Sequence, residues 1–179
     1  MKKTKWKKYS FKKYDPSFPK WFSHERNELK RVLKKEKIEH IGSTSVLGLG
    51  GKGIVDIAVF SPNKLIEHAK KKISSLGYEE WPVPKKLKFF SFKKIYGPET
   101  SPDKIFHIHI TSDKKIFEKM LIFRDYLNEY PNISEKYAGL KKKASKICKG
   151  NGKVYVKLKN PFIKSTIKKA EKEKNIVKK

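Results

Sequence analysis

The segment IEHIGSTSVLGLGGKGIVDIAVF, residues 38–60, carries the most specific structural signal in the chain. A short apolar-alternating run reaches the turn Gly42-Ser43-Thr44-Ser45, a glycine-rich bridge follows, and a strand-like run then carries a single acid, Asp56. Small and hydroxyl residues after a strand let backbone N–H groups approach an anion closely, so the turn predicts a phosphate contact. A carboxylate on the next strand could hold a divalent cation against that phosphate. A plain strand-turn-strand, whose glycines only reverse the chain, explains the spacing equally well.

Helical and strand periodicities continue on both sides of this segment. Helices are predicted from Pro19 to near Glu36, over 63–77, over Lys114–Glu129, over Ser134–Lys149, and from Phe162 onward behind an Asn160-Pro161 cap. Further strands are predicted at Tyr78–Trp81, Leu87–Tyr96 and Lys104–Ile110, with an edge strand near Tyr9–Lys13 and a hairpin loop over Gly97–Asp103. A mixed sheet with helices before and after it is an α+β arrangement.

The length and composition favour a single folded domain. At 179 residues, with 37% apolar residues, the chain has enough interior for a core. We expect residues 1–179 to form one domain, with a basic arm over 1–10 and a lysine-rich tail over 166–179. The single cysteine, Cys148, excludes an internal disulfide and is expected to be a buried thiol. Because neither a secretory signal nor a long apolar run is present, we expect a cytoplasmic protein without a membrane partner.

The charge is extreme and almost entirely due to lysine. The formal net charge is +27, and only Arg26, Arg31 and Arg124 are arginine. Lysine is a hydrated point charge, whereas arginine is the usual residue for bidentate recognition of bases and phosphates. The lysine excess is also what an AT-rich genome or a heat-adapted proteome produces. The surface nevertheless predicts attraction to polyanions at low salt, so a nucleic acid is one expected partner.

The segment HIGSTSVLGLGGKGIVDI resembles the signature of the GrpB family, a branch of the nucleotidyltransferase-fold superfamily. The similarity extends over about residues 10–165, although Leu47 and Gly53 stand where that family usually has proline. The resemblance implies a nucleotidyltransferase-like mixed sheet flanked by N-terminal and C-terminal helices. Further matching motifs are Tyr14-Asp15-Pro16, His107-Ile108-His109-Ile110, Phe123-Arg124-Asp125-Tyr126-Leu127, and Tyr137 with Leu140-Lys141.

The resemblance also raises the question of a metal site. Enzymes of this superfamily place two carboxylates at i and i+2 of a strand, where they hold Mg²⁺ for nucleotidyl transfer. Here the two positions are Asp56 and Ala58, so one carboxylate is missing. The side chains of His107 and His109 point to one face of their strand and, in the superfamily fold, would face Asp56.

These residues give a set of candidates with open alternatives. Asp56, His107 and His109 are the expected catalytic residues, and with His40 they could bind a divalent metal such as Mg²⁺, Mn²⁺ or Zn²⁺. Imidazole suits transition metals better than it suits Mg²⁺. Histidines at i and i+2 are also often polar-face residues with ordinary hydrogen bonds, and they serve equally well as phosphate contacts or general acid/base groups.

The remaining candidates surround the expected phosphate. Gly42, Ser43, Thr44, Ser45, Lys52 and Arg124 are the predicted ligand-binding residues. Arg124 has an alternative role in an ion pair with Asp125 or Glu25, and Tyr126, Tyr137 and Lys141 are expected to pack or to line the pocket wall. Two functions follow: a nucleotidyltransferase-like protein that binds a nucleotide or phosphorylated small molecule, with phosphoester hydrolysis as a variant, or a non-catalytic binder of RNA or another polyanion.

Overall fold

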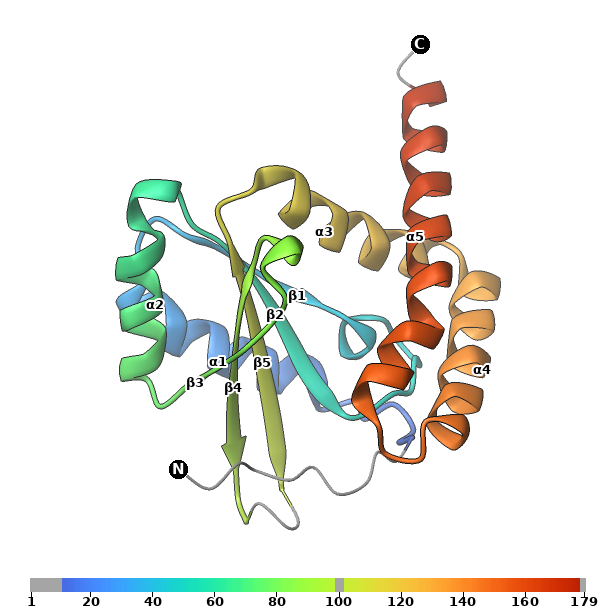
Figure 1. Cartoon of the computed structure of the whole chain (residues 1–179), viewed down its shortest axis with the longest axis horizontal. Helices are drawn as coiled ribbons and strands as arrows, with labels where there is room; N and C mark the ends of the chain where they lie inside the picture. The colour runs from blue at the N-terminus through green and yellow to red at the C-terminus, as the bar shows by residue number, and fades with distance from the viewer. Residues whose placement is uncertain (1–10, 99–101, 178–179) are drawn as a thin grey trace.

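The computed structural model describes residues 11–98 and 102–177, and its centre is a five-stranded mixed sheet (Figure 1). The strand order is β1-β2-β5-β4-β3. This is the predicted α+β fold. The strands are β1 (Lys37–Ile41), β2 (Ile54–Phe60), β3 (Glu79–Trp81), β4 (Phe90–Tyr96) and β5 (Lys104–Thr111).

The pairing of the strands fixes which side chains share a face. β2 is antiparallel to β1 and parallel to β5, and β4 is antiparallel to both β5 and β3. β4 and β5 form the hairpin that was predicted on either side of the Gly97–Asp103 connection. The parallel pair β2–β5 brings together residues about fifty positions apart in the sequence, which local periodicity alone does not determine.

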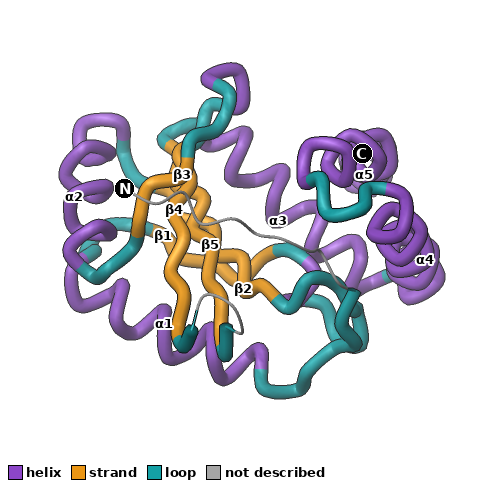
Figure 2. The backbone as a smooth tube through the Cα atoms, turned by 60° about the horizontal axis from the view of Figure 1, so that its bottom comes forward, coloured by secondary structure: helices purple, strands orange, loops and turns teal. Residues whose placement is uncertain are grey.

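Two helices cover one face of the sheet and close the main core. They are α1 (Phe18–Val32) and α2 (Ile66–Ser75), which follows a 3₁₀ turn at Asn63–Leu65. Leu29 of α1 and Ile73 of α2 are fully buried against the strands, because both helices carry an apolar stripe at helical spacing. Figure 2 shows α1 on one side of the sheet and α3 on the other.

The opposite face is covered only in part. The helices on this side are α3 (Lys114–Glu129), α4 (Pro131–Ile147) and α5 (Gly152–Val177). Phe117 of α3 packs on Ile41 and Ala58 at the β1–β2 end of the sheet. Beside it, Leu127 and Tyr137 pack with the loop that follows β1, while α4 and α5 stand at one edge (Figures 1 and 2).

Several predicted boundaries need correction. The last helix begins at Gly152 rather than Phe162, because Asn151 Oδ1 accepts hydrogen bonds from the backbone N–H groups of Lys153 and Val154. Pro161 therefore lies inside α5, and residues 166–177, the described part of the expected tail over 166–179, continue that helix. The C-terminal turns of α5 extend beyond the rest of the molecule (Figure 1).

Smaller differences occur at two other elements and at the N-terminus. α4 begins at Pro131 rather than Ser134, since proline fits the first turn of a helix. β4 begins at Phe90 rather than Leu87, because residues 85–87 form a 3₁₀ turn. The expected arm over 1–10 lies outside the described residues, and of the predicted edge strand the structure shows a single bridge between Lys12 and Gly51. No described helix is both long and apolar enough to span a membrane.

Candidate functional site

The register of the parallel pair places one acid and two histidines together. Asp56 is the β-sheet partner of His107, and Ala58 is the partner of His109. Because partners in a register share a face, the three polar side chains point to the same side of the sheet, away from α1 and α2. Their side chains are 22–28% exposed, so they remain accessible beside the apolar patch under Phe117.

The distances within this group fit a shared metal ion. Asp56 Oδ1 lies 3.6 Å from both His107 Nδ1 and His109 Nε2, and one ligand atom of each residue falls within 4.8 Å of the others. Bonds of about 2.1 Å to a tetrahedral or octahedral metal separate adjacent ligand atoms by about 3.0–3.4 Å. The two distances from Asp56 to the histidines therefore need only a small contraction. Among the described residues, this is the one such group of histidines, cysteines and acids.

The same contacts determine the charge of Asp56. Burial by itself would raise the pKa of this carboxyl group, but its interactions with His107 and His109 hold the pKa well below its usual range. Asp56 is therefore an anion at neutral pH. An anionic oxygen flanked by imidazole nitrogens is a donor set typical of transition-metal sites.

His109 is held in place by residues of β4 and its preceding loop. Its Nδ1 lies 2.9 Å from the hydroxyl of Ser91, which is its partner in the register, and Phe89 packs edge-on against the ring at 5.3 Å. If Nδ1 carries the proton, it donates to Ser91 Oγ and leaves the Nε2 lone pair facing Asp56. Ser91 was missed by the sequence analysis; its only signal is that it alternates with Lys93 on the polar face of β4.

The Gly-Ser turn lies directly against Asp56. Gly42 has φ +73°, and a Cβ atom at this position would collide with Asp56 Oδ2. The residues Ser43–Ser45 form a 3₁₀ turn in which both serines are half-buried, and the Ser45 hydroxyl donates to the Gly42 carbonyl at 2.7 Å. The turn and the carboxylate thus border the same space, as the anion-binding prediction requires.

Two predicted contacts around the turn differ in the structure. Thr44 is buried, and its hydroxyl is used inside the fold, where it donates to the Ile54 carbonyl and lies 2.9 Å from His40 Nε2. His40 is the register partner of Ile57, so it points to the α1 face, where its ring stacks on Phe22 with centroids 4.6 Å apart. Burial lowers the pKa of His40 to about 4. The prediction that His40 shares a metal with Asp56 is therefore corrected: the two side chains lie on opposite faces.

Three lysines approach the turn from different parts of the chain. Lys52 lies at the end of the glycine bridge, Lys141 on α4 and Lys159 on α5. Lys141 is buried, as expected for a pocket-wall residue, and its ammonium group donates to the Gly50 carbonyl. Lys159 was not predicted, because one lysine among so many carries no distinct sequence signal. Tyr126 and Tyr137 are buried in the helical cores, which agrees with the packing role that was expected for them.

Arg124 takes the role that was predicted as its alternative. Its guanidinium group donates to Asp125 at 2.7 Å, to Glu39 at 3.0 Å and to the His40 carbonyl at 3.0 Å, and so ties α3 to β1. Glu25, the other proposed partner, instead accepts from Lys94 and Tyr96. The structure therefore gives Arg124 a structural role at the border of the site.

Replacing Arg124 with alanine is expected to lower the free energy of unfolding by about 1–3 kcal/mol, because partly buried Glu39 and the His40 carbonyl lose a charged donor. Urea unfolding measures this loss. The control Arg31→Ala removes an exposed ion pair with Glu28 and should cost about 0.5 kcal/mol or less. An unchanged stability together with a large loss of nucleotide affinity would instead assign Arg124 to ligand binding.

Comparisons with known proteins agree on the family and the fold. The family model described as GrpB protein matches residues 8–169. The UPF0157 protein YqkA of Bacillus subtilis is 27% identical over 165 residues, which cover 90% of this chain and 47% of YqkA. A UPF0157 protein of Halalkalibacterium halodurans is 29% identical over 166 residues, covering 88% of this chain and 80% of that protein. The chain thus spans about half the length of the Bacillus relative.

Solved structures show the same architecture. The crystal structure of the conserved protein GrpB from Enterococcus faecalis has a TM-score of 0.74 at 29% identity, covering 92% of this chain and 98% of that one. The Cid1 poly(U) polymerase with MgGTP bound has a TM-score of 0.52 at 14% identity, covering 75% of this chain and 44% of that one. At such low identity the second similarity concerns the fold alone, which is that of the nucleotidyltransferases.

Proposed function

The chain belongs to the GrpB family, and from this premise we propose that it binds a nucleotide or another phosphorylated ligand at the Gly42–Ser45 turn, beside one divalent metal ion. The observation that carries the proposal is the position of Asp56. Its Oδ1 atom lies 3.6 Å from a nitrogen of each of His107 and His109, while Oδ2 lies against Gly42.

The donor set supports Mn²⁺ or Zn²⁺ more than Mg²⁺, because two of its three members are imidazoles. A metal bound there would act as a Lewis acid on a phosphoryl oxygen. Asp56 and the two histidines would hold the metal, and Ser91 would keep Nε2 of His109 directed at it. The turn would position the phosphate next to Asp56 through close backbone approach.

The reaction class that fits this arrangement is nucleotidyl transfer, with phosphoester hydrolysis as the variant in which water is the acceptor. Ala58 is fully buried beneath Phe117, so nothing polar stands where the second carboxylate of the superfamily would be. The proposal is accordingly for a site that uses a single metal ion.

Calorimetric titration of a nucleoside triphosphate in the presence and absence of Mn²⁺ tests the proposal. We expect Mn²⁺ to increase the affinity of the wild-type protein, and His107→Ala to remove that increase because a ligand is lost. The control His68→Ala changes an exposed histidine on α2 and should behave like the wild type. Equal affinities with and without Mn²⁺ in the wild type would overturn the proposal.

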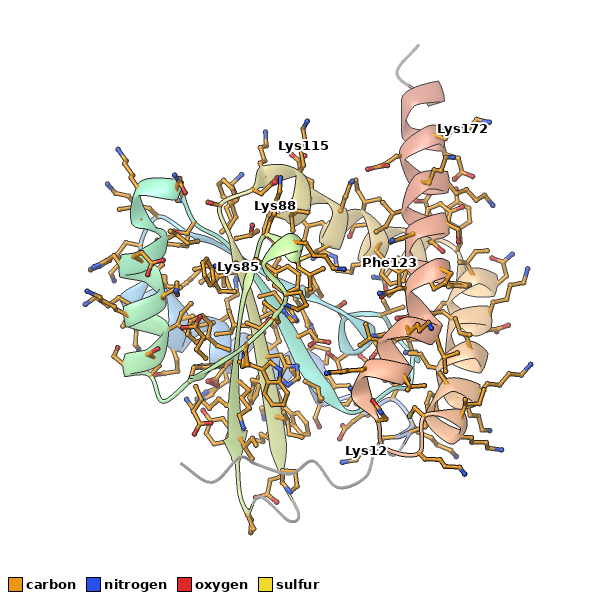
Figure 3. The ribbon with its side chains drawn as sticks, viewed as in Figure 1. Lys12, Lys85, Lys88, Lys115, Phe123 and Lys172 are labelled. Atoms are coloured by element: carbon orange, nitrogen blue, oxygen red, sulfur yellow. The ribbon has the colours of Figure 1, made fainter. Side chains whose placement is uncertain are left out.

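A basic rim beside His109 favours a second candidate function, the binding of a polyanion such as RNA. Lys85 and Lys88 lie at the 3₁₀ turn of residues 85–87, and Lys115 lies on the first turn of α3 (Figure 3). Phe89, the residue after Lys88, contacts His109. If the protein is only a binder, RNA affinity should fall steeply with salt and should be the same in His107→Ala as in the wild type.

A further inference from the structure

The side chains of Lys52, Lys141 and Lys159 form a compact group, which we call the lysine cluster. The ammonium groups of Lys52 and Lys159 each lie 5.0 Å from the ring centroid of Tyr155, a buried residue of α5. Lys141 lies over the ring of Tyr137 at 4.8 Å. The cluster therefore combines the glycine bridge with two helices, and its members are fixed by aromatic packing rather than spread in solvent.

The lysine cluster adjoins the turn that is expected to hold a phosphate. A Cβ atom on Gly51 would lie 3.4 Å from Lys141 Nζ and would collide with Ser43 Oγ. The ammonium group of Lys141 and the hydroxyl of Ser43 thus flank the same glycine. An anion that contacts Ser43 would have this buried cation within reach.

The positive charges of the cluster act on one another. Burial, together with the charge of Lys159, lowers the pKa of Lys141 to about 7, and burial, together with the charge of Lys52, lowers that of Lys159 to about 8. The carboxylate that acts on all three ammonium groups is Asp56, which also faces the two histidines. Buried like charges are unfavourable by themselves, and a polyanion would relieve their repulsion.

Among residues 11–98 and 102–177, the group of Asp56, His107 and His109 is the one candidate metal site, so a second cation has no further set of ligands there. It would need a carboxylate at the position of Ala58, which is buried against Phe117. In two-metal sites one ion neutralises the charge on the leaving group. The lysine cluster offers positive charge beside Ser43 of the turn.

We propose that Lys52, Lys141 and Lys159 form a polyphosphate-binding site, which takes the terminal phosphates of a di- or triphosphate ligand and supplies the charge that a second metal supplies in two-metal enzymes. This inference rests on the proposed function for the position of the ligand. It goes further by naming the ligand class as a polyphosphate rather than a monophosphate. It also predicts a component of binding that needs no metal.

Calorimetric titration with inorganic phosphate, pyrophosphate and tripolyphosphate in EDTA tests the inference. For the wild type we expect affinity to rise with the number of phosphates. Lys159→Met and Lys141→Met should each weaken tripolyphosphate binding about tenfold or more, because each removes one charged hydrogen-bond donor. The controls Lys157→Met and Lys142→Met change exposed lysines on the same helices and should weaken it less than about twofold.

Further variants separate this inference from the proposed function. Asp56→Asn should bind tripolyphosphate in EDTA as well as the wild type or more tightly, because a nearby negative charge is removed. The wild type could bind tripolyphosphate in EDTA and yet show no Mn²⁺-dependent binding of a nucleotide. That result would overturn the proposed function and leave the inference standing. Equal affinity for phosphate and tripolyphosphate, or equal losses in the Lys159→Met and Lys157→Met variants, would overturn the inference. Because Lys159 is only half-buried, its variant tests the cluster even if Lys141→Met does not fold.

Discussion

Replacing Asp56 with asparagine is expected to lower the affinity for Mn²⁺ by at least about 100-fold. Loss of a residue that merely orients a ligand typically costs 10–100-fold, and Asp56 is proposed as a ligand itself. It is also the only anion of its three-residue group, so the substitution removes the charge that attracts the cation. Asparagine keeps the size of the side chain, which limits effects on packing against Gly42.

Isothermal titration with Mn²⁺, supported by metal analysis of the purified protein, measures this loss. The matched control is Asp125→Asn, which removes an aspartate that is paired with Arg124 on α3 and lies outside the metal group. Its Mn²⁺ affinity should stay within about twofold of the wild type. If the two variants lose affinity equally, Mn²⁺ binds through general surface charge and the metal site is elsewhere or absent.

Replacing Gly42 with alanine is expected to lower the free energy of unfolding by about 3 kcal/mol or more and to abolish Mn²⁺-dependent nucleotide binding. Two costs combine at this residue. Its dihedrals, φ +73° and ψ −166°, belong to a region that essentially only glycine adopts, and its new Cβ would collide with Asp56 Oδ2. The turn or the carboxylate must therefore move.

Gly48→Ala separates these two costs. Gly48 also has a positive φ, +74°, but a Cβ there would meet nothing within 4 Å. We expect its urea-unfolding free energy to fall by only about 1–2 kcal/mol, with nucleotide binding retained. Similar losses of stability and binding in both variants would show that the contact between Gly42 and Asp56 contributes to neither the free energy of unfolding nor nucleotide binding.

The main features of the fold could be predicted from the sequence because they depend on local patterns. The alternation of His107 and His109 with isoleucines predicts two imidazoles on one face of a strand, and the superfamily topology places that strand beside Asp56. The register confirms both expectations. The face of the sheet to which His40 points, by contrast, depends on how β1 pairs with β2 across a glycine-rich connection. Its register opposite Ile57 therefore could not be inferred from spacing.

The residues that were missed are those whose role depends on tertiary packing. Lys159 is indistinguishable in the sequence from the other lysines, and its position follows from how α5 packs beside the glycine bridge. Ser91 is a single hydroxyl in a strand, and only the β4–β5 register brings it to His109. The continuous helix through Pro161 was missed because proline usually favours a helix start.

If the proposed metal site is correct, the parallel pairing of β2 with β5 would link protein lifetime to cellular metal supply. Asp56 is about fifty residues from His107 and His109 along the chain, so the denatured ensemble does not hold the three ligands together. A metal that binds the native group would stabilise the folded state. It would raise the free energy of unfolding by about 2.7 kcal/mol at a free metal concentration of 100 times its dissociation constant. Starvation for that metal would then expose the chain to proteolysis, and its abundance would become a gauge of metal status.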